Sequence, residues 1–448
     1  MSDFLANFVR DDRTGIDFID NNRSALGSYS YGGGFSSGGS FNDQDGGSDG
    51  PEDDPRVQDP EESFYAKKDD CLRTIVKIRN MPDEELVIKP LKRSALTFLN
   101  KSVIFYGPSG SGKTFLIYFY MFLMQHLFPL VFIFAPTNDE KHDFDNIVPI
   151  PLIFTEFGLE DIKSIYQRQK AATQIYNMAN NLKVLYSLFN RVAQPKARQI
   201  YRKILLLRLK ILKRIPETYE AESVRKAKTQ SVEELFKYKF IKFYKSVIAP
   251  HIRMLLTQNL TKEEKFAIRY INFNPRTLVV FDDSTVEILN LIKEGKKKIK
   301  GQINQSGEHI KNFFFKGRWA NITHWYAFHD DARLETDIRK NAFYSFFCNR
   351  QVALSYFQRP ANNFSPADKK RAEAAINMVF SDTAPSKHTK LVYAREEGKF
   401  YYVVAEDVGN FTMCSDQIRA YCEKIKTNDK LTDTNNPFMS RFTEKINF

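Results

Sequence analysis

The stretch that decides the fold is Ser102-Val-Ile-Phe-Tyr-Gly-Pro-Ser-Gly-Ser-Gly-Lys-Thr114. Its second part, from Gly107 onward, fits the pattern G-x-x-x-x-G-K-[S/T] in full. A short apolar run precedes this pattern, and an apolar helical segment, Lys113–Phe128, follows it. In such a strand–loop–helix order, backbone N–H groups and the helix N-terminus face one point, and the glycines let an anion approach closely. The stretch therefore predicts a phosphate-binding loop, or P-loop.

The side chains at the end of this loop indicate a nucleoside triphosphate and its metal ion. Lys113 is expected to reach the β- and γ-phosphates, and the hydroxyl of Thr114 is expected to bind Mg²⁺. ATP and Mg²⁺ are therefore the expected ligand and metal. The residues predicted to bind the nucleotide are Gly107, Pro108, Ser109, Gly110, Ser111, Gly112, Lys113 and Thr114.

Further apolar segments predict an α/β fold, a P-loop NTPase with a mostly parallel sheet. Leu130–Ala135 follows the P-loop helix, and Thr277–Phe281, Ile322–Phe328 and Ala342–Phe347 come later in the chain. Short, fully apolar strands that alternate with helices are typical of a sheet covered on both faces. The apolar run 115–135 has the length of a membrane span, but the P-loop before it assigns it to a helix and a strand, so no membrane association is expected.

One of these strands ends in two acids. Leu278–Phe281 is followed by Asp282 and Asp283. At the carboxyl end of a parallel strand, carboxylates lie where Mg²⁺ and the γ-phosphate bind. Asp282 is expected to hold the metal, and Asp283 to orient or deprotonate the attacking water. A strand capped by a turn has the same pattern, so this prediction depends on the P-loop.

Three more residues are candidates for the catalytic machinery. His329 follows the strand Ile322–Phe328, where a polar residue at the strand tip would sense the γ-phosphate; a surface histidine is the alternative. Arg318 and Arg339 are candidates for an arginine that stabilises transition-state charge on a neighbouring subunit's nucleotide. Most arginines make only surface ion pairs, and this alternative stays open for both.

Composition and charge divide the chain into five expected segments. The 448 residues are 42% apolar, and the four cysteines form no C-x-x-C pair, which gives no support to a disulfide scaffold or a zinc site. Residues 1–65 carry a net charge of −10 against +12 for the whole chain, so the remainder carries +22. The expected segments are an acidic Gly/Ser-rich flexible and disordered tail (1–60), the first part of the ATPase core (61–155), a basic, mainly helical insert (156–274), the second part of the core (275–410) and a C-terminal tail (411–448).

The basic insert indicates a polyanionic partner. Thirteen Lys and Arg and no acid occur between Ile162 and Pro216, with apolar residues at helical spacing. Such a surface, together with the lysine-rich segment 293–301, would contact duplex DNA through its phosphates without reading its sequence. An amphipathic insert whose basic side chains only face water is the alternative.

The order of these motifs resembles that of the DNA-packaging ATPases of double-stranded DNA viruses, in the FtsK–HerA division of P-loop ATPases. The resemblance covers roughly residues 100–160 and 275–405. Among these ATPases, the poxvirus member has a glutamine at the strand tip and the adenovirus member a histidine, as His329 here; the poxvirus member has a histidine where this chain has Trp319. The segments that carry the resemblance are 107–114, Ala135-Pro136-Thr137, Phe281-Asp282-Asp283, Gly317-Arg318 and Arg339-Lys340-Asn341-Ala342.

The resemblance implies a RecA/FtsK-like sheet and a homo-oligomeric ring that hydrolyses ATP at its interfaces and drives double-stranded DNA into a capsid. A capsid or portal protein is then the expected partner. The expected location is inside the host cell, in the nucleus or at a cytoplasmic assembly site, or in association with the virion. The alternatives are a helicase or replication NTPase stimulated by nucleic acid, a nucleotide-binding structural virion protein, and a nucleotide kinase, which the paired aspartates disfavour.

Overall fold

The structure is a computed structural model that describes residues 71–78, 82–91, 97–215, 222–296, 298–299, 302–303, 312–329, 334, 336–381, 384–386 and 388–426. The tail expected over residues 1–60 lies outside these ranges. The described chain forms two compact units. One is the helical unit, Lys170–Pro275; the other, the sheet unit, is made of the described residues up to Gln169 and from Arg276 onward.

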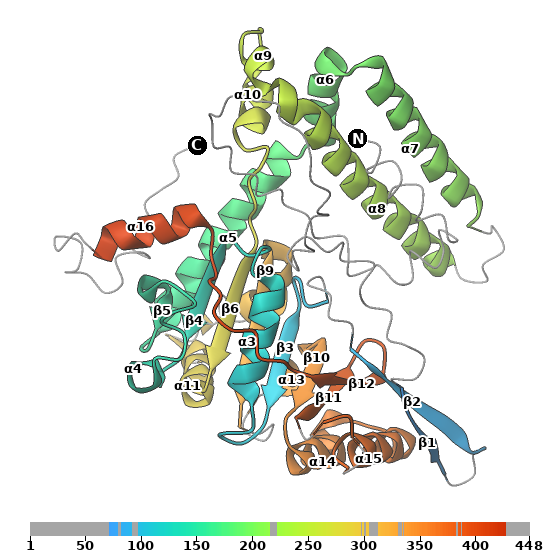
Figure 1. The fold of residues 1–448 in the computed structure, drawn as a ribbon, viewed down its shortest axis with the longest axis vertical. Helices are drawn as coiled ribbons and strands as arrows, with labels where there is room; N and C mark the ends of the chain where they lie inside the picture. Colours follow the sequence, from blue (N-terminus) through green and yellow to red (C-terminus); the bar gives the residue numbers. More distant parts are fainter. Residues whose placement is uncertain are drawn as a thin grey trace, which may run out of the picture. The chain divides into compact units, whose positions relative to one another are not determined.

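Ten strands of the sheet unit form one sheet in the order β1-β2-β12-β11-β10-β3-β9-β6-β4-β5 (Figure 1). From β10 to β5 in this order all neighbours are parallel. Beyond β10, strands β11 and β12 form an antiparallel hairpin, and β1–β2 extend the sheet further. The strands are β1 Leu72–Val76, β2 Glu84–Pro90, β3 Ser102–Tyr106, β4 Leu130–Phe134, β5 Ile153–Phe154, β6 Thr277–Asp282, β9 Ile322–Phe328, β10 Tyr344–Phe347, β11 Thr389–Ala394 and β12 Lys399–Val404; β7 Lys298–Ile299 and β8 Gln302–Ile303 pair separately.

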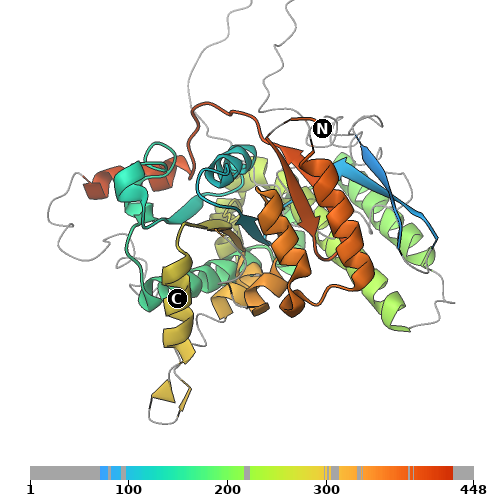
Figure 2. The same cartoon turned by 90° about the horizontal axis from the view of Figure 1, so that it is seen from below.

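Helices lie on both sides of this sheet (Figure 2). Every residue of β4, β6 and β9 is buried, as a parallel sheet with two covered faces requires. The predicted α/β fold with a mostly parallel sheet is confirmed. The helices of the sheet unit are α3 Lys113–Met124, α4 Asn138–Lys141, η2 Ile150–Leu152, α11 Thr285–Lys296, η4 Gly317–Ala320, α13 Thr336–Asn341, α14 Arg350–Gln358, η5 Pro360–Asn362, α15 Pro366–Val379 and α16 Asp416–Lys426. None of the described helices is long and apolar enough to cross a membrane.

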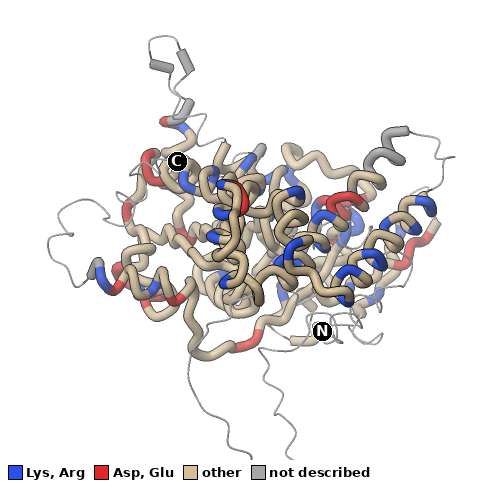
Figure 3. Tube along the Cα trace, turned by 90° about the horizontal axis from the view of Figure 1, so that it is seen from above, with Lys and Arg blue, Asp and Glu red and all other residues tan. Residues whose placement is uncertain are grey.

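The helical unit has its own apolar core. Its helices are α6 Leu182–Val192, α7 Pro195–Lys213, α8 Glu222–Ile248, η3 Ala249–His251, α9 Ile252–Leu256 and α10 Lys262–Arg269, and the boundary between the units falls within α5, Leu159–Ala179. Phe189, Tyr201 and Tyr244 pack together in this core, from three different helices. Arg191 is exposed, and its guanidinium donates to both carboxylate oxygens of the buried Glu264, each at 3.0 Å, so this basic residue has a structural partner within the unit. Figure 3 shows the Lys and Arg positions of the described chain.

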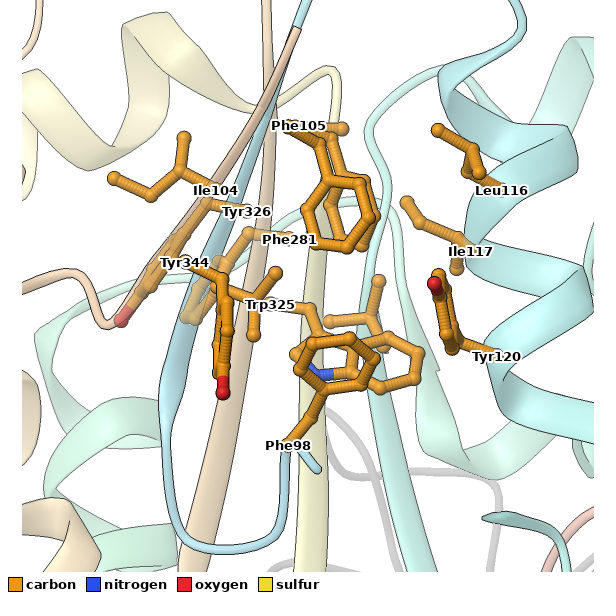
Figure 4. Packing of buried hydrophobic residues seen from close by; sticks show 14 of the residues in the cluster. Phe98, Ile104, Phe105, Leu116, Ile117, Tyr120, Phe281, Trp325, Tyr326 and Tyr344 are labelled. Carbon is orange, nitrogen blue, oxygen red and sulfur yellow. The ribbon is translucent and has the colours of Figure 1, made fainter. Parts of the chain in front are cut away.

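Aromatic residues dominate the interior of the sheet unit (Figure 4). Phe134, Phe281 and Tyr326 occupy one register across β4, β6 and β9, and their rings stack with centroids 4.8 and 5.3 Å apart. Such cross-strand aromatic pairs stabilise a sheet beyond the burial of their area. The stack lies just below the carboxyl ends of the strands and so supports the loops that leave this edge.

Candidate nucleotide-binding site

The P-loop and the predicted residues Asp282, Asp283 and His329 gather at the carboxyl edge of the sheet. The P-loop leaves β3, Asp282 ends β6, and His329 follows β9. Strand β9 lies between β3, which leads into the P-loop, and β6, which ends in Asp282. The N–H of Gly107 donates to the carbonyl of Phe328 at 3.0 Å, which fixes the start of the loop against the end of β9.

The glycines of the loop have geometric reasons to be glycine. A Cβ on Gly107 would stand 2.4 Å from Ser111 Oγ and 2.9 Å from Cys348 Cβ. Gly110 and Gly112 have φ values of 72° and 88°, in the left-handed region that side chains disfavour. Gly112 is also the N-cap of α3, so the turn that it permits aims the helix N-terminus into the loop.

The side chain of Lys113 lies against the backbone of the P-loop. Its Nζ donates to the carbonyls of Gly107 at 2.7 Å and Pro108 at 3.0 Å. The side chain is nearly buried, and burial lowers the pKa of its ammonium, an effect that the nearby Asp282 opposes. The two carbonyls hold the ammonium at the loop with its charge largely desolvated, which makes it a strong point charge for a phosphate.

The two predicted metal ligands are in contact. Thr114 Oγ1 donates to Asp282 Oδ2 at 3.4 Å, although the residues are 168 positions apart. Asp282 is 6% exposed, and burial raises the pKa of its carboxyl to about 6, with Lys113 acting in the opposite direction. A hydroxyl and a carboxylate are the hard oxygen ligands that Mg²⁺ prefers, so this pair fits the expected ion.

No group of three or more His, Cys, Asp or Glu suited to a metal ion occurs among the described residues.

The carboxylate of Asp283 contacts two basic side chains. Its Oδ1 lies 2.6 Å from His329 Nε2, and its Oδ2 lies 3.7 Å from Lys141 Nζ. The backbone of Asp283 has φ 51°, a left-handed conformation that Asp adopts more readily than most residues. The predicted sensor therefore contacts the predicted water-activating carboxylate directly.

The two candidate arginines are not brought to this group of residues. Arg318 lies in η4, before β9 begins, and therefore at the opposite edge of the sheet from the P-loop. Its exposed guanidinium stacks over Trp319 and Phe343, 5.2 and 5.6 Å from the ring centroids. Arg339, in α13, is 4% exposed, and its Nη2 donates to Thr336 Oγ1 at 2.9 Å.

Two lysines reach the site without having been predicted. Lys141 comes from α4, after β4, and contacts Asp283. Lys390 comes from β11, and its Nζ donates to the carbonyl of Cys348 beside the loop at 3.4 Å. No sequence motif marks either lysine, and each contacts a residue far away in the sequence. Only the order of the strands in the sheet shows that they lie at the site.

The relatives of this chain are viral proteins. No family model matches. The chain is 27% identical over 381 residues to "Uncharacterized protein B354L" of African swine fever virus (isolate Pig/Kenya/KEN-50/1950), which covers 81% of this chain and 98% of the relative. It is 28% identical over 93 residues to "Uncharacterized protein 075L" of Invertebrate iridescent virus 6, or 21% of this chain and 36% of that one.

Solved structures with partial similarity include two proteins that were determined with ATP analogues. The pCW3 conjugation coupling protein TcpA with ATPγS is 10% identical, covers 82% of this chain and 72% of its own, and has a TM-score of 0.31. The genome packaging NTPase B204 of Sulfolobus turreted icosahedral virus 2 with AMPPCP is 11% identical, covers 68% and 96%, and has a TM-score of 0.28. Superpositions with such low scores do not bear on the site, which rests on its own contacts.

Proposed function

We propose that this protein is an ATP-hydrolysing motor that moves double-stranded DNA, most specifically for packaging a viral genome into a capsid. The observation that carries the proposal is the convergence, at one sheet edge, of the P-loop with Lys113, the Thr114–Asp282 pair and the Asp283–His329 pair. Binding, metal coordination and activation of water each have a residue of suitable chemistry there.

The chemistry divides among these residues as follows. The loop N–H groups, the N-terminus of α3 and Lys113 bind the phosphates and offset their charge. Thr114 and Asp282 would hold Mg²⁺, which when bound neutralises charge on the phosphates. Asp283 orients or deprotonates the attacking water, and His329 and Lys141 fix its carboxylate from two sides. A carboxylate next to the metal ligand favours transfer to water over transfer to a small acceptor.

Duplex DNA is the proposed polymer because the chain carries both a hydrolytic site and a separate basic unit. On α7, Lys196, Lys203 and Lys210 recur every seven residues and are exposed, and Lys213 continues the same side. Ala197, Ile200 and Ile204 turn inward on this helix. A row of lysines on one side of a helix suits the phosphate backbone of DNA and reads no sequence. The motif order and the viral relatives support packaging as the specific role, with a homo-oligomeric ring and a capsid or portal protein as partners.

The test is steady-state ATP hydrolysis with and without duplex DNA, for the wild type and for Asp283→Asn. Asparagine tolerates the left-handed backbone at this position, so the variant removes the charge and keeps the loop. We expect turnover stimulated by duplex DNA, and a fall of at least about a hundredfold in the variant with nucleotide binding retained, because only the base is lost.

A matched control is Glu373→Gln. Its Oε2 lies 3.7 Å from Lys370 Nζ, the same separation as that of Asp283 Oδ2 from Lys141 Nζ, but on a helix away from the site. Tight nucleotide binding without turnover in the wild type, with or without DNA, would instead support a structural nucleotide-binding protein. Strand separation on forked DNA would support a helicase.

A further inference from the structure

Lys390 lies beside the P-loop on the side away from the aspartates. It is the second residue of β11, which runs antiparallel to β10, so it stands at the carboxyl edge of the sheet. Its Cε lies 3.9 Å from the point where a Cβ on Gly112 would stand. Its Nζ has one described hydrogen bond, the 3.4 Å contact to the carbonyl of Cys348. The ammonium is thus next to the loop and only weakly held.

The charges around Lys390 favour an anion. Among the described residues, no Asp or Glu forms an ion pair with Lys390. Burial raises the pKa of the Cys348 thiol to about 11, and Lys390 and Lys113 both oppose this rise, so both ammonium groups lie near the same thiol. Two lysines and the N-terminus of α3 therefore concentrate positive charge on one loop.

The strand order indicates which part of a nucleotide this lysine would meet. Asp282 and His329 leave β6 and β9, on one side of β3, whereas Lys390 belongs to β11, beyond β10 on the other side. The terminal phosphate belongs with the metal ligands and the water-activating Asp283. A phosphate that contacts Lys390 is then not the terminal one, and it is present in ADP as well as in ATP.

We propose that Lys390 is a second phosphate-binding lysine of this site, which contacts a phosphate other than the terminal one and so contributes equally to the binding of ATP and ADP. This inference rests on the proposed function, because it assumes that the P-loop binds a nucleotide. Lys390 then sets nucleotide affinity, while Asp283 and its partners set the rate of hydrolysis.

The experiment measures the Kd of the full-length protein for ADP and for ATP by calorimetry with Mg²⁺ present, and ATP is replaced by its non-hydrolysable analogue AMPPCP so that no turnover occurs. Lys390→Met keeps the length of the side chain and removes the charge. We expect Kd to rise about tenfold for both nucleotides, the size of effect typical for the loss of one hydrogen bond to a charged group. Lys390→Arg should restore most of the affinity. The control is Lys399→Met, an exposed lysine of the same hairpin at the opposite edge of the sheet.

The outcomes separate this inference from the proposed function. If Lys113→Ala binds ADP and ATP as the wild type does, the nucleotide site itself is wrong. If Lys113→Ala loses binding and Lys390→Met does not, only the role of Lys390 is overturned. Weakened binding of ATP with unchanged binding of ADP would also overturn it, because the contact would then be to the terminal phosphate.

Discussion

His324 is a buried imidazole in the middle of β9. It is 1% exposed and packs against Phe313, with ring centroids 4.6 Å apart. A Cβ on Gly317 would stand 2.1 Å from its Cε1, so the glycine before Arg318 makes room for this ring. The glycine of the Gly317-Arg318 element therefore has a packing role, independent of what the arginine does.

This burial makes stability depend on pH. Desolvation lowers the pKa of His324 from 6.5 to about 3, so at intermediate pH the unfolded chain binds a proton that the folded chain does not. The free energy of unfolding should therefore fall as pH falls from 6.5 towards 3, by up to about 1.4 kcal/mol per pH unit from this residue alone. Urea unfolding at pH 7 and pH 5 measures the difference.

The variant His324→Gln isolates this contribution, because it cannot take up the proton. Its loss of stability between pH 7 and pH 5 should be smaller than that of the wild type. His388→Gln, at an exposed histidine, should match the wild type. If the wild type and His324→Gln lose the same stability between pH 7 and pH 5, His324 is not the source of the pH dependence.

Single residues also show where sequence reasoning stops. Lys113, Thr114 and Asp282 could be predicted because each belongs to a local pattern with a stated chemical use. Lys141 and Lys390 could not, because nothing near them in the sequence marks them; they reach the site only through the pairing of β4 with β6 and of β10 with β11.

At the scale of elements, local apolar runs predicted strands well. Ser102–Tyr106 and Ile322–Phe328 are strands over the predicted residues. The predicted ends of the elements are less accurate. Strand β10 begins at Tyr344 rather than at Ala342, and helix α3 ends at Met124 rather than at Phe128. Capping and tertiary packing set such ends, and the apolar pattern does not encode them.

Two elements were not predicted as such. Helix α16 lies within residues 411–448, where a tail was expected, and its Cys422 is buried. Its apolar residues Ile418, Tyr421, Cys422 and Ile425 have helical spacing, but the helix is short and most of its other residues are polar. Strands β1 and β2 come from a stretch of mixed charged and apolar residues, and β1 pairs only with β2 in the described sheet. Both strands are partly exposed, and partly exposed strands leave a weaker apolar pattern in the sequence than buried ones.

Helix α7 carries the prediction that tests DNA binding. Replacing Lys196, Lys203, Lys210 and Lys213 by Gln leaves the inward residues of the helix intact. If these lysines contact phosphates, the slope of log K against log salt should become shallower by about 3 to 4, or roughly 0.9 for each phosphate that is no longer neutralised. Filter binding of duplex DNA across a salt series measures the slope.

The control replaces four exposed lysines of the same unit that lie off α7, so the net charge changes equally. These are Lys183, Lys237, Lys262 and Lys265. We expect the control to keep nearly the wild-type slope. Two variants with the same slope would assign the effect to net charge alone and would reduce α7 to a solvated face.

At the scale of the whole molecule, the proposed ring requires that one chain complete its neighbour's site. Asp283 and His329 are partly exposed at the sheet edge, so the group of residues is open to another chain. Of the two candidate arginines, Arg318 is exposed and Arg339 is 4% exposed. An arginine can act on another subunit only if it is accessible, so Arg318 is the first to test.

Complementation between inactive variants decides whether Arg318 acts in trans. Lys113→Ala and Arg318→Ala should each be inactive alone. In a ring assembled from equal amounts of both, about a quarter of the interfaces combine an intact Lys113 with an intact Arg318 of the neighbour, so about a quarter of wild-type turnover should return. Mixing Lys113→Ala with Asp283→Asn is the control, because both changes disable the same site in cis and no activity should return. An Arg318→Ala variant that is active alone, or a mixture that stays inactive, would remove Arg318 from the catalytic machinery, and the same pair of mixtures with Arg339→Ala would then test the remaining candidate.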